Sequence, residues 1–192
     1  ECSPTIAVTK NEVRRSDLSV GLPVPNVEVK IDKPNKDNIG EILVRGKNVM
    51  KGYYRDAQQT KEVITPDGYF KTGDLGYFGK DGALFVVGRS KELIIRSGFN
   101  VFPPEVEAML TKHPSVYQAA VIGKKTKTNE DILAFILTDG EVIETELKQW
   151  LRKYLAPYKI PQHIHIVKKF PTAATGKILK HKLTTFFADI LH

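Results

Sequence analysis

The sequence predicts an α+β fold, with a small antiparallel, β-barrel-like unit followed by a compact domain of a three-stranded sheet and helices. Three observations lead to this prediction. Apolar Val27, Val29 and Ile31 alternate with charged residues, as in a strand with one buried face. Glycines, several of them beside aspartate, mark tight turns in the first half. After Gly88, short apolar runs alternate with segments of helical period.

The first half contains two further short strand candidates. Residues 42–45 and 84–87 are apolar runs of strand length, Ile-Leu-Val-Arg and Leu-Phe-Val-Val. Between them lie the glycines that we interpret as turn residues: Gly68, Gly73, Gly76, Gly79 and Gly82. Residues 1–87 are therefore expected to form one turn-rich antiparallel unit.

In the second half, residues 88–192, a helix and then two strands are predicted first. Pro104 suits the first position of a helix, and Val106 and Leu110 form an i, i+4 apolar pair on it. Residues 116–122 and 132–137 are apolar enough to be strands.

Two more helices are expected toward the C-terminus. Leu147, Leu151 and Leu155 recur at i, i+4 and i+8, and this helix should stop before Pro157. The apolar face of a last helix is predicted from Leu179, Leu183, Phe186 or Phe187, and Ile190. No Pro-, Gly- or Ser-rich linker separates the halves, so a boundary near residues 88–91 implies a short hinge.

Composition limits the function classes without choosing among them. The net charge is +7, and most of the positive excess lies in the second half. Residues 1–87 hold 13 Lys/Arg and 12 Asp/Glu, whereas residues 88–192 hold 16 Lys/Arg and 10 Asp/Glu. This excess suits nucleic acid, a membrane surface, a phosphate-bearing small molecule or a solvated lysine-rich surface. The single Cys2 allows no intramolecular disulfide. We expect a cytoplasmic protein with no transmembrane segment, and the missing initiating Met suggests a fragment.

Three segments carry residues suited to chemistry. In residues 69–76, YFKTGDLG, a Thr-Gly turn precedes Asp74, whose carboxylate can accept two hydrogen bonds, as a ribose would offer. A surface aspartate at a turn is the alternative.

In residues 88–107, GRSKELIIRSGFNVFPPEVE, Arg89 suits ribose or phosphate oxygens and Gly98 allows close approach of a ligand. The alternative is a strand that leads into a helix.

The third segment, residues 170–180, reads FPTAATGKILK and presents Lys177 from a Thr-Gly-Lys turn that we expect to open the last helix. A lysine on such a loop can stabilise phosphate oxygens. The segment is not a GxxxxGK[ST] phosphate loop, because residue 178 is Ile and the upstream glycine is absent. A chance Gly-Lys pair is the alternative.

In this order and spacing, the segments resemble the adenylate-forming (AMP-binding) superfamily of acyl-CoA synthetases, aryl-CoA ligases, luciferases and peptide-synthetase adenylation domains. The resemblance covers essentially the whole chain. It extends to Glu1-Cys2-Ser3-Pro4, which is similar to the end of a family segment, and to two further motifs, GEILVRGKNVMKGYY (40–54) and LAPYKIP (155–161). One departure is that Thr172 and Ala173 stand where the family usually has a basic residue and then Thr or Asn.

The resemblance assigns roles to single residues. It implies that Asp74 and Arg89 bind the ribose of ATP and that Lys177 is the adenylation lysine. It also implies that Lys91 is the hinge and that Gly98 lets the pantetheine arm of CoA pass.

For the metal, the resemblance implies that Mg²⁺ binds the triphosphate and that Glu1 helps to hold it. Residues 1–87 would be the C-terminal β subdomain of the large AMP-binding domain, and residues 88–192 the mobile C-terminal domain.

The implied function is that of the C-terminal portion of an AMP-forming acid–CoA ligase. Such an enzyme activates a carboxylic acid with ATP to an acyl-adenylate and transfers the acyl group to CoA. The phosphate-binding loop and the acid pocket are expected in a missing N-terminal domain, so the fragment alone should be inactive and the acid is not indicated. A peptide-synthetase-type adenylation domain and a non-catalytic binding module remain alternatives. We expect no nucleic-acid partner, because no such motif is recognisable.

Overall fold

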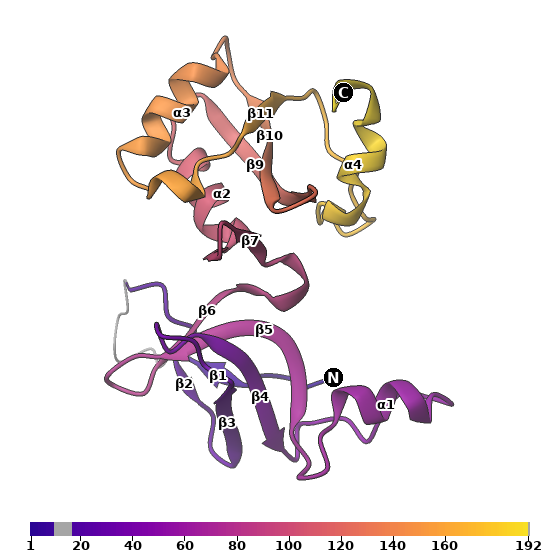
Figure 1. Cartoon of the computed structure of the whole chain (residues 1–192). Coiled ribbons are helices and arrows are strands. Elements are labelled where there is room, and N and C mark those ends of the chain that lie inside the picture. The colour runs from indigo at the N-terminus through magenta and orange to yellow at the C-terminus, as the bar shows by residue number, and fades with distance from the viewer. Residues whose placement is uncertain (10–16, 192) are drawn as a thin grey trace. The chain divides into compact units, whose positions relative to one another are not determined.

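The computed structural model describes residues 1–9 and 17–191, and the chain forms two compact units, Glu1–Lys91 and Glu92–His192 (Figure 1). None of the helices in the described residues is long and apolar enough to cross a membrane.

The first unit is built on a four-stranded antiparallel sheet. Its order is β3-β4-β5-β6, with β3 at Val27–Asp32, β4 at Gly40–Gly46, β5 at Phe70–Phe78 and β6 at Leu84–Arg89. The strands predicted around residues 27–31, 42–45 and 84–87 are thereby confirmed. In the described residues β3 and β6 are the edge strands of this sheet and do not pair with each other, so it does not close into a barrel. Gly21 forms a single antiparallel bridge with Leu84 on β6.

Smaller elements flank the sheet. Two short strands, β1 (Ala7–Val8) and β2 (Leu22–Pro23), pair antiparallel with each other. Helix α1 (Ala57–Val63), which the sequence reasoning missed, starts where the Asp56 side chain accepts a hydrogen bond from Gln59 N.

Strand β5 corrects the interpretation of two glycines as turn residues. Gly73 and Gly76 lie inside this strand. A Cβ at Gly76 would stand 2.2 Å from Phe85 O, so glycine is needed for close approach of the neighbouring strand. Gly73 has φ +74° and sits where β5 bulges out of its ladder with β4.

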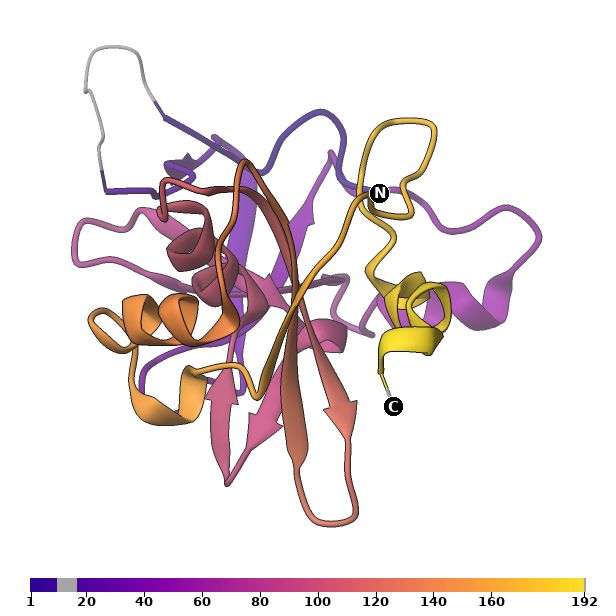
Figure 2. The same cartoon turned by 90° about the horizontal axis from the view of Figure 1, so that it is seen from above.

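The second unit is built on a three-stranded sheet with helices, as predicted. The order of the strands is β11-β10-β9, and their directions are mixed. Strands β9 (Val116–Lys125) and β10 (Glu130–Thr138) form an antiparallel hairpin, visible in Figure 2. Strand β11 (His163–Ile166) runs parallel to β10, and helix α3 (Glu144–Arg152) lies in the connection between them.

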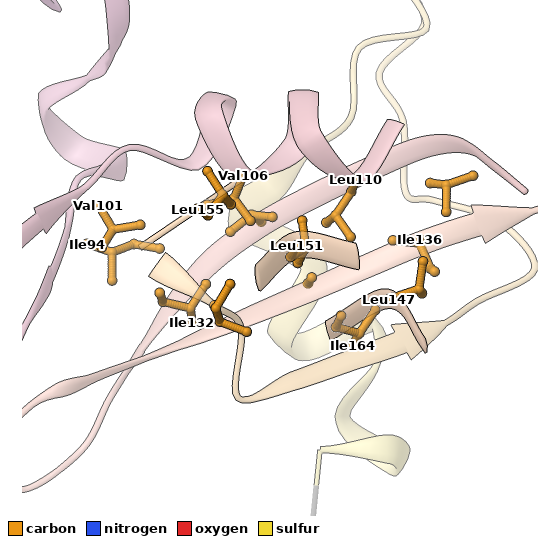
Figure 3. Close-up of a cluster of buried hydrophobic side chains, with 14 of the residues drawn as sticks. Ile94, Val101, Val106, Leu110, Ile132, Ile136, Leu147, Leu151, Leu155 and Ile164 are labelled. Atoms are coloured by element: carbon orange, nitrogen blue, oxygen red, sulfur yellow. The ribbon is translucent and has the colours of Figure 1, made fainter. Parts of the chain in front are cut away.

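Both faces of this sheet are covered, which explains why β10 is almost continuously apolar. Helices α2 (Pro103–Thr111) and α3 lie on one side, and the C-terminal segment lies on the other (Figures 1 and 2). In the larger cluster, shown in Figure 3, residues of both helices pack against alternate residues of β10. The residues labelled there are Ile94, Val101, Val106, Leu110, Ile132, Ile136, Leu147, Leu151, Leu155 and Ile164. The other face packs Leu133, Phe135 and Leu137 against Phe170 and Leu183.

The predictions of the first two helices of the second half are right in position and differ at the ends. Helix α2 begins at Pro103, one residue before the predicted Pro104. Helix α3 ends at Arg152, so Leu155 lies beyond it, although it is still buried in the same cluster.

The predicted last helix is wrong as a continuous element. The chain there forms a 3₁₀ turn η3 (Lys180–Lys182), a single α-turn α4 (Leu183–Phe186) and a 3₁₀ turn η4 (Ala188–Ile190). Phe187 has φ −112° and ψ 28°, outside the helical region, and its ring stacks on Phe135 with centroids 5.0 Å apart. Packing of this aromatic pair takes precedence over helical continuity.

Candidate functional site

The centre of the candidate site is an ion pair across two neighbouring strands of the first unit. Asp74 on β5 is the register partner of Arg89 on β6, and Arg89 Nε lies 3.0 Å from Asp74 Oδ1. The Asp74 side chain is 33% exposed and that of Arg89 is 56% exposed, so both can reach a ligand. An exposed pair of this kind adds at most about 1 kcal/mol to stability, which makes orientation its main effect.

The backbone around Asp74 is held in place by its neighbours. Lys71 pairs with Leu43 and Leu75 pairs with Glu41, so residues 72–74 bulge from the ladder with β4. Thr72 Oγ1 donates to Ile42 O at 2.8 Å and accepts from Asp74 N at 3.0 Å. The Thr-Gly turn expected before Asp74 is thus a braced bulge within a strand.

A concave pocket of about 570 Å³ opens beside this pair. Tyr53 Oη in this pocket donates to Glu1 Oε1 at 3.1 Å. Desolvation and the hydrogen bond to Glu1 raise the pKa of Tyr53, so its phenol remains a donor at neutral pH. Other polar residues of the lining are Glu41, Gln59, Glu62, Lys71, Thr72, Asp74, Arg89, Ser90 and Lys91.

The donor set of the pocket can be compared with the needs of a magnesium ion. In residues 1–9 and 17–191, no group of three or more His, Cys, Asp or Glu side chains is arranged to hold a metal. Mg²⁺ in nucleotide sites takes one or two carboxylates, and phosphates and water supply the other ligands. The exposed carboxylate of Glu1 is suited to be one of these carboxylate ligands.

Lys91 lies at the end of the first unit. It is the exposed middle residue of the 3₁₀ turn η1 (Ser90–Glu92), and the division between the two compact units falls directly after it. Arg89 stands only two residues earlier, at the end of β6.

Gly98 belongs to a hairpin of the second unit, between β7 (Ile94–Arg96) and β8 (Phe99–Val101). Ser97 has φ 50° and Gly98 has φ 79°, the values of a tight two-residue turn. A Cβ at Gly98 would meet nothing within 4 Å, so the position is open. The loop between β9 and β10 braces the turn, because Asn129 Oδ1 accepts from Ser97 N at 2.8 Å.

Lys177 is exposed on a closed loop of the second unit. Ala173 N donates to Lys177 O at 2.9 Å, Gly176 N donates to Ala173 O at 2.9 Å and Leu179 N donates to Pro171 O at 2.8 Å. Gly176 has φ 82°, which explains glycine in this turn. Lys177 therefore projects from a hairpin-like loop, and the expectation that its turn opens a helix is wrong.

The structure brings four of the six candidate residues to one pocket: Glu1, Asp74, Arg89 and Lys91. Gly98 and Lys177 belong to the second unit. Sequence reasoning missed Tyr53 and Thr72. The spacing of Thr72 two residues before Asp74 was a usable signal, whereas nothing local to Tyr53 indicates its contact with Glu1.

Comparisons with known proteins match both units. Residues 1–54 match the AMP-binding enzyme family, and residues 105–177 match the AMP-binding enzyme C-terminal domain. The chain is 41% identical over 170 residues to a 2-succinylbenzoate–CoA ligase of Bacillus licheniformis, which covers 86% of this chain and 35% of the relative. It is also 41% identical over 193 residues to a probable 4-coumarate–CoA ligase of Dictyostelium discoideum, which covers 95% of this chain and 35% of the relative.

A solved structure of a CoA synthetase is also similar to this chain. The o-succinylbenzoate CoA synthetase of Bacillus subtilis in complex with ATP and a magnesium ion superimposes with a TM-score of 0.80 at 35% identity, covering 87% of this chain and 36% of that one. The chain thus spans about a third of the length of the relatives it matches. From the first unit with its Asp74–Arg89 pocket to the second unit with its Lys177 loop, the chain belongs to the adenylate-forming, AMP-binding enzymes.

Proposed function

We propose that the protein is an ATP-dependent, AMP-forming acid–CoA ligase and that this chain is its C-terminal portion. Such a ligase converts a carboxylic acid to an acyl-adenylate and then to an acyl-CoA thioester. The observation that carries the proposal is the Asp74–Arg89 pair beside a pocket of about 570 Å³. The relatives named as CoA ligases, which match most of the chain, support it.

Asp74 and Arg89 are proposed to hold the ribose of ATP. A carboxylate has about four lone-pair sites, so Asp74 can bind Arg89 and still accept from two adjacent hydroxyls. Arg89 in turn offers further N–H donors to ribose oxygens. When the ribose is held in place, the α-phosphorus is held in position as well. Neither charged side chain has to lie at the reacting atoms for this effect.

Lys177 is proposed as the catalytic residue of the first half-reaction. The acid carboxylate attacks the α-phosphorus, the bond to the bridging oxygen breaks, and pyrophosphate leaves with that electron pair. The Lys177 ammonium neutralises negative charge that develops on the phosphate and carboxylate oxygens. Mg²⁺, when bound to the triphosphate, would offset the charge of the leaving pyrophosphate, and Glu1 is its proposed protein ligand.

The second half-reaction needs a path for the thiol of CoA. We propose Lys91 as the hinge at which the second unit turns, because dihedral changes of hinges concentrate in a few residues at element ends. Gly98 is proposed to line the pantetheine path, and its open Cβ position is consistent with that role. The domain division proposed for the enzyme is residues 1–87 and 88–192.

The whole reaction is proposed for the full-length protein and not for this chain alone. Because the chain spans about 35% of the relatives' length, the phosphate-binding loop and the acid pocket are assigned to an N-terminal domain. We also propose a cytoplasmic location, which subcellular fractionation tests.

ATP–pyrophosphate exchange on the full-length protein, with a panel of aryl, short-chain and long-chain acids, tests the first half-reaction. Thioester formation with CoA or with a carrier protein then tests the acceptor. Acid-dependent exchange followed by acyl-CoA formation is expected. Exchange with transfer only to a carrier protein would instead indicate a peptide-synthetase-type enzyme, and absence of exchange with binding of DNA or RNA would indicate a binding module.

A further inference from the structure

A partly buried lysine outside the candidate site makes two ion pairs within the second unit. Lys180 Nζ lies 2.9 Å from Glu92 Oε2 and 2.8 Å from Glu107 Oε1. The exposed fractions of the side chains are 21% for Lys180, 35% for Glu92 and 18% for Glu107. We call these three residues the Lys180 clamp.

The clamp joins three separate segments of the second unit, of which that of Lys180 is far from the other two in the sequence. Glu92 is the first residue of the second unit and directly follows Lys91. Glu107 lies on α2, and its Oε1 also accepts from Val121 N on β9 at 2.7 Å. Lys180 begins η3, three residues after Lys177. One ammonium group therefore ties the end of the Lys177 loop to the sheet and to the start of the unit.

The electrostatics favour a charged and tightly held lysine. Burial by itself lowers the pKa of Lys180, but the carboxylates of Glu107 and Glu92 outweigh it and the pKa is raised. A raised lysine pKa in the folded state means stabilisation that is present at neutral pH and lost only as the pH rises through that value. Without the ammonium, two partly buried carboxylates would face each other unpaired.

The loop before the clamp has little freedom of its own. Its base is closed by the hydrogen bond from Leu179 N to Pro171 O at 2.8 Å, and Lys180 is the next residue. The orientation of this closed loop is thus set mainly at its base, where the clamp holds the chain.

We propose that Lys180 is a positioning residue that acts through its two carboxylate partners to aim the Lys177 loop. It contacts no substrate. Because Glu92 directly follows Lys91, the same clamp makes the loop move with the first residue of the second unit. For the role of Lys177 the inference rests on the proposed function, whereas the clamp itself does not.

The test compares three variants of the full-length protein: Lys180→Met, which keeps the length of the side chain and removes its charge, Lys180→Arg, and Lys182→Met as the control. Lys182 is an exposed lysine of the same turn. Three quantities are measured: kcat and KM for ATP in pyrophosphate exchange, the rate of thioester formation from supplied acyl-adenylate, and amide hydrogen exchange of residues 171–179.

We expect Lys180→Met to lower kcat of adenylation about 10²-fold, the loss typical of a misplaced reacting group. Its KM for ATP and its thioester rate should stay near those of the unaltered protein. Hydrogen exchange in residues 171–179 should accelerate, while that of β10 should not. Lys180→Arg should recover most of the activity, and Lys182→Met should change nothing.

Glu107→Gln gives a second route to the same result. Glutamine can still accept from Val121 N, so this variant removes one charge of the clamp and retains the bond to β9. It should reproduce a smaller selective loss of adenylation.

Equal losses in both half-reactions, or unchanged adenylation and unchanged exchange in residues 171–179, would overturn the inference. Failure of the proposed function looks different. If the unaltered protein forms no acyl-adenylate, that function is wrong, and hydrogen exchange in Lys180→Met still decides whether the clamp holds the loop.

Discussion

Asp74 and Arg89 face each other across the antiparallel pair β5–β6, and Arg89 Nε lies 3.0 Å from Asp74 Oδ1. The strands that carry them are joined by a tight connection, and a stack of Tyr77 on Phe85, with centroids 4.9 Å apart, lies between the ion pair and that connection. The sheet therefore holds the two charged groups in a fixed relation in the absence of any ligand, which is the preorganisation that the proposed ribose site would need.

Asp74→Asn in the full-length protein should raise KM for ATP by about 10- to 100-fold, because a hydrogen bond to a charged group contributes about 1.5–3 kcal/mol. The measurement is pyrophosphate exchange at varied ATP. Asp37→Asn, at an exposed turn of the same unit, is the control and should leave KM unchanged. An unaltered KM in Asp74→Asn would remove Asp74 from the ribose site.

Lys177→Ala should abolish adenylation and spare thioester formation from supplied acyl-adenylate, because its charge is needed only where phosphate charge develops. The two half-reactions are assayed separately. Lys169→Ala, an exposed lysine ahead of the loop, should retain both. Equal loss in both half-reactions of Lys177→Ala would refute the assignment.

Lys91→Pro should slow the thioester step selectively, since proline fixes φ at the residue proposed to turn. Lys91→Ala removes the same side chain and leaves the backbone free, so it separates the backbone effect from loss of charge. The ratio of the two half-reaction rates is the readout. A ratio that does not differ between the two variants would count against the hinge.

Gly98→Leu should impair thioester formation more than adenylation, because its side chain would enter the proposed pantetheine path. Gly140→Leu is a matched control. Gly140 has φ 91° against 79° for Gly98, and a Cβ at either position meets nothing within 4 Å. Both variants carry a backbone strain of about 1–2 kcal/mol. KM for CoA should rise only in Gly98→Leu, and a similar rise in both would point to strain alone.

Leu151→Ala should lower the free energy of unfolding by about 2–5 kcal/mol, the usual cost of a cavity at a fully buried leucine. Leu151 is 0% exposed within the cluster of Figure 3. Denaturant unfolding gives the measurement. Ile143→Ala, at a side chain 65% exposed, should change stability by less than about 0.5 kcal/mol.

The sequence was informative where one local pattern determines the outcome. The alternation of apolar and charged residues at Val27–Ile31 indicated a strand, and the structure has one there. The spacing of Leu147 and Leu151 indicated the buried face of a helix, which the structure also has. Asp74 and Lys177 could be singled out because each sits in a short motif with a glycine that its backbone requires.

The remainder depends on contacts that no local pattern encodes. Gly73 and Gly76 resemble turn residues, yet a bulge and the close approach of β6 place them inside β5. The Lys180 clamp joins Lys180 to Glu92 across 88 positions, so its charges look like ordinary surface residues in the sequence. The last helix breaks because Phe187 stacks on Phe135, a partner from another element.

Phe170 and Leu183 lie one on each side of the Lys177 loop, and both are buried in the same cluster. A movement of the loop that pulled either side chain out of this cluster would expose it to water, at about 1.5–3 kcal/mol for each. Rotation of the second unit as one body would expose neither. If Lys177 has the proposed role, burial of these two side chains therefore favours its withdrawal together with the whole unit.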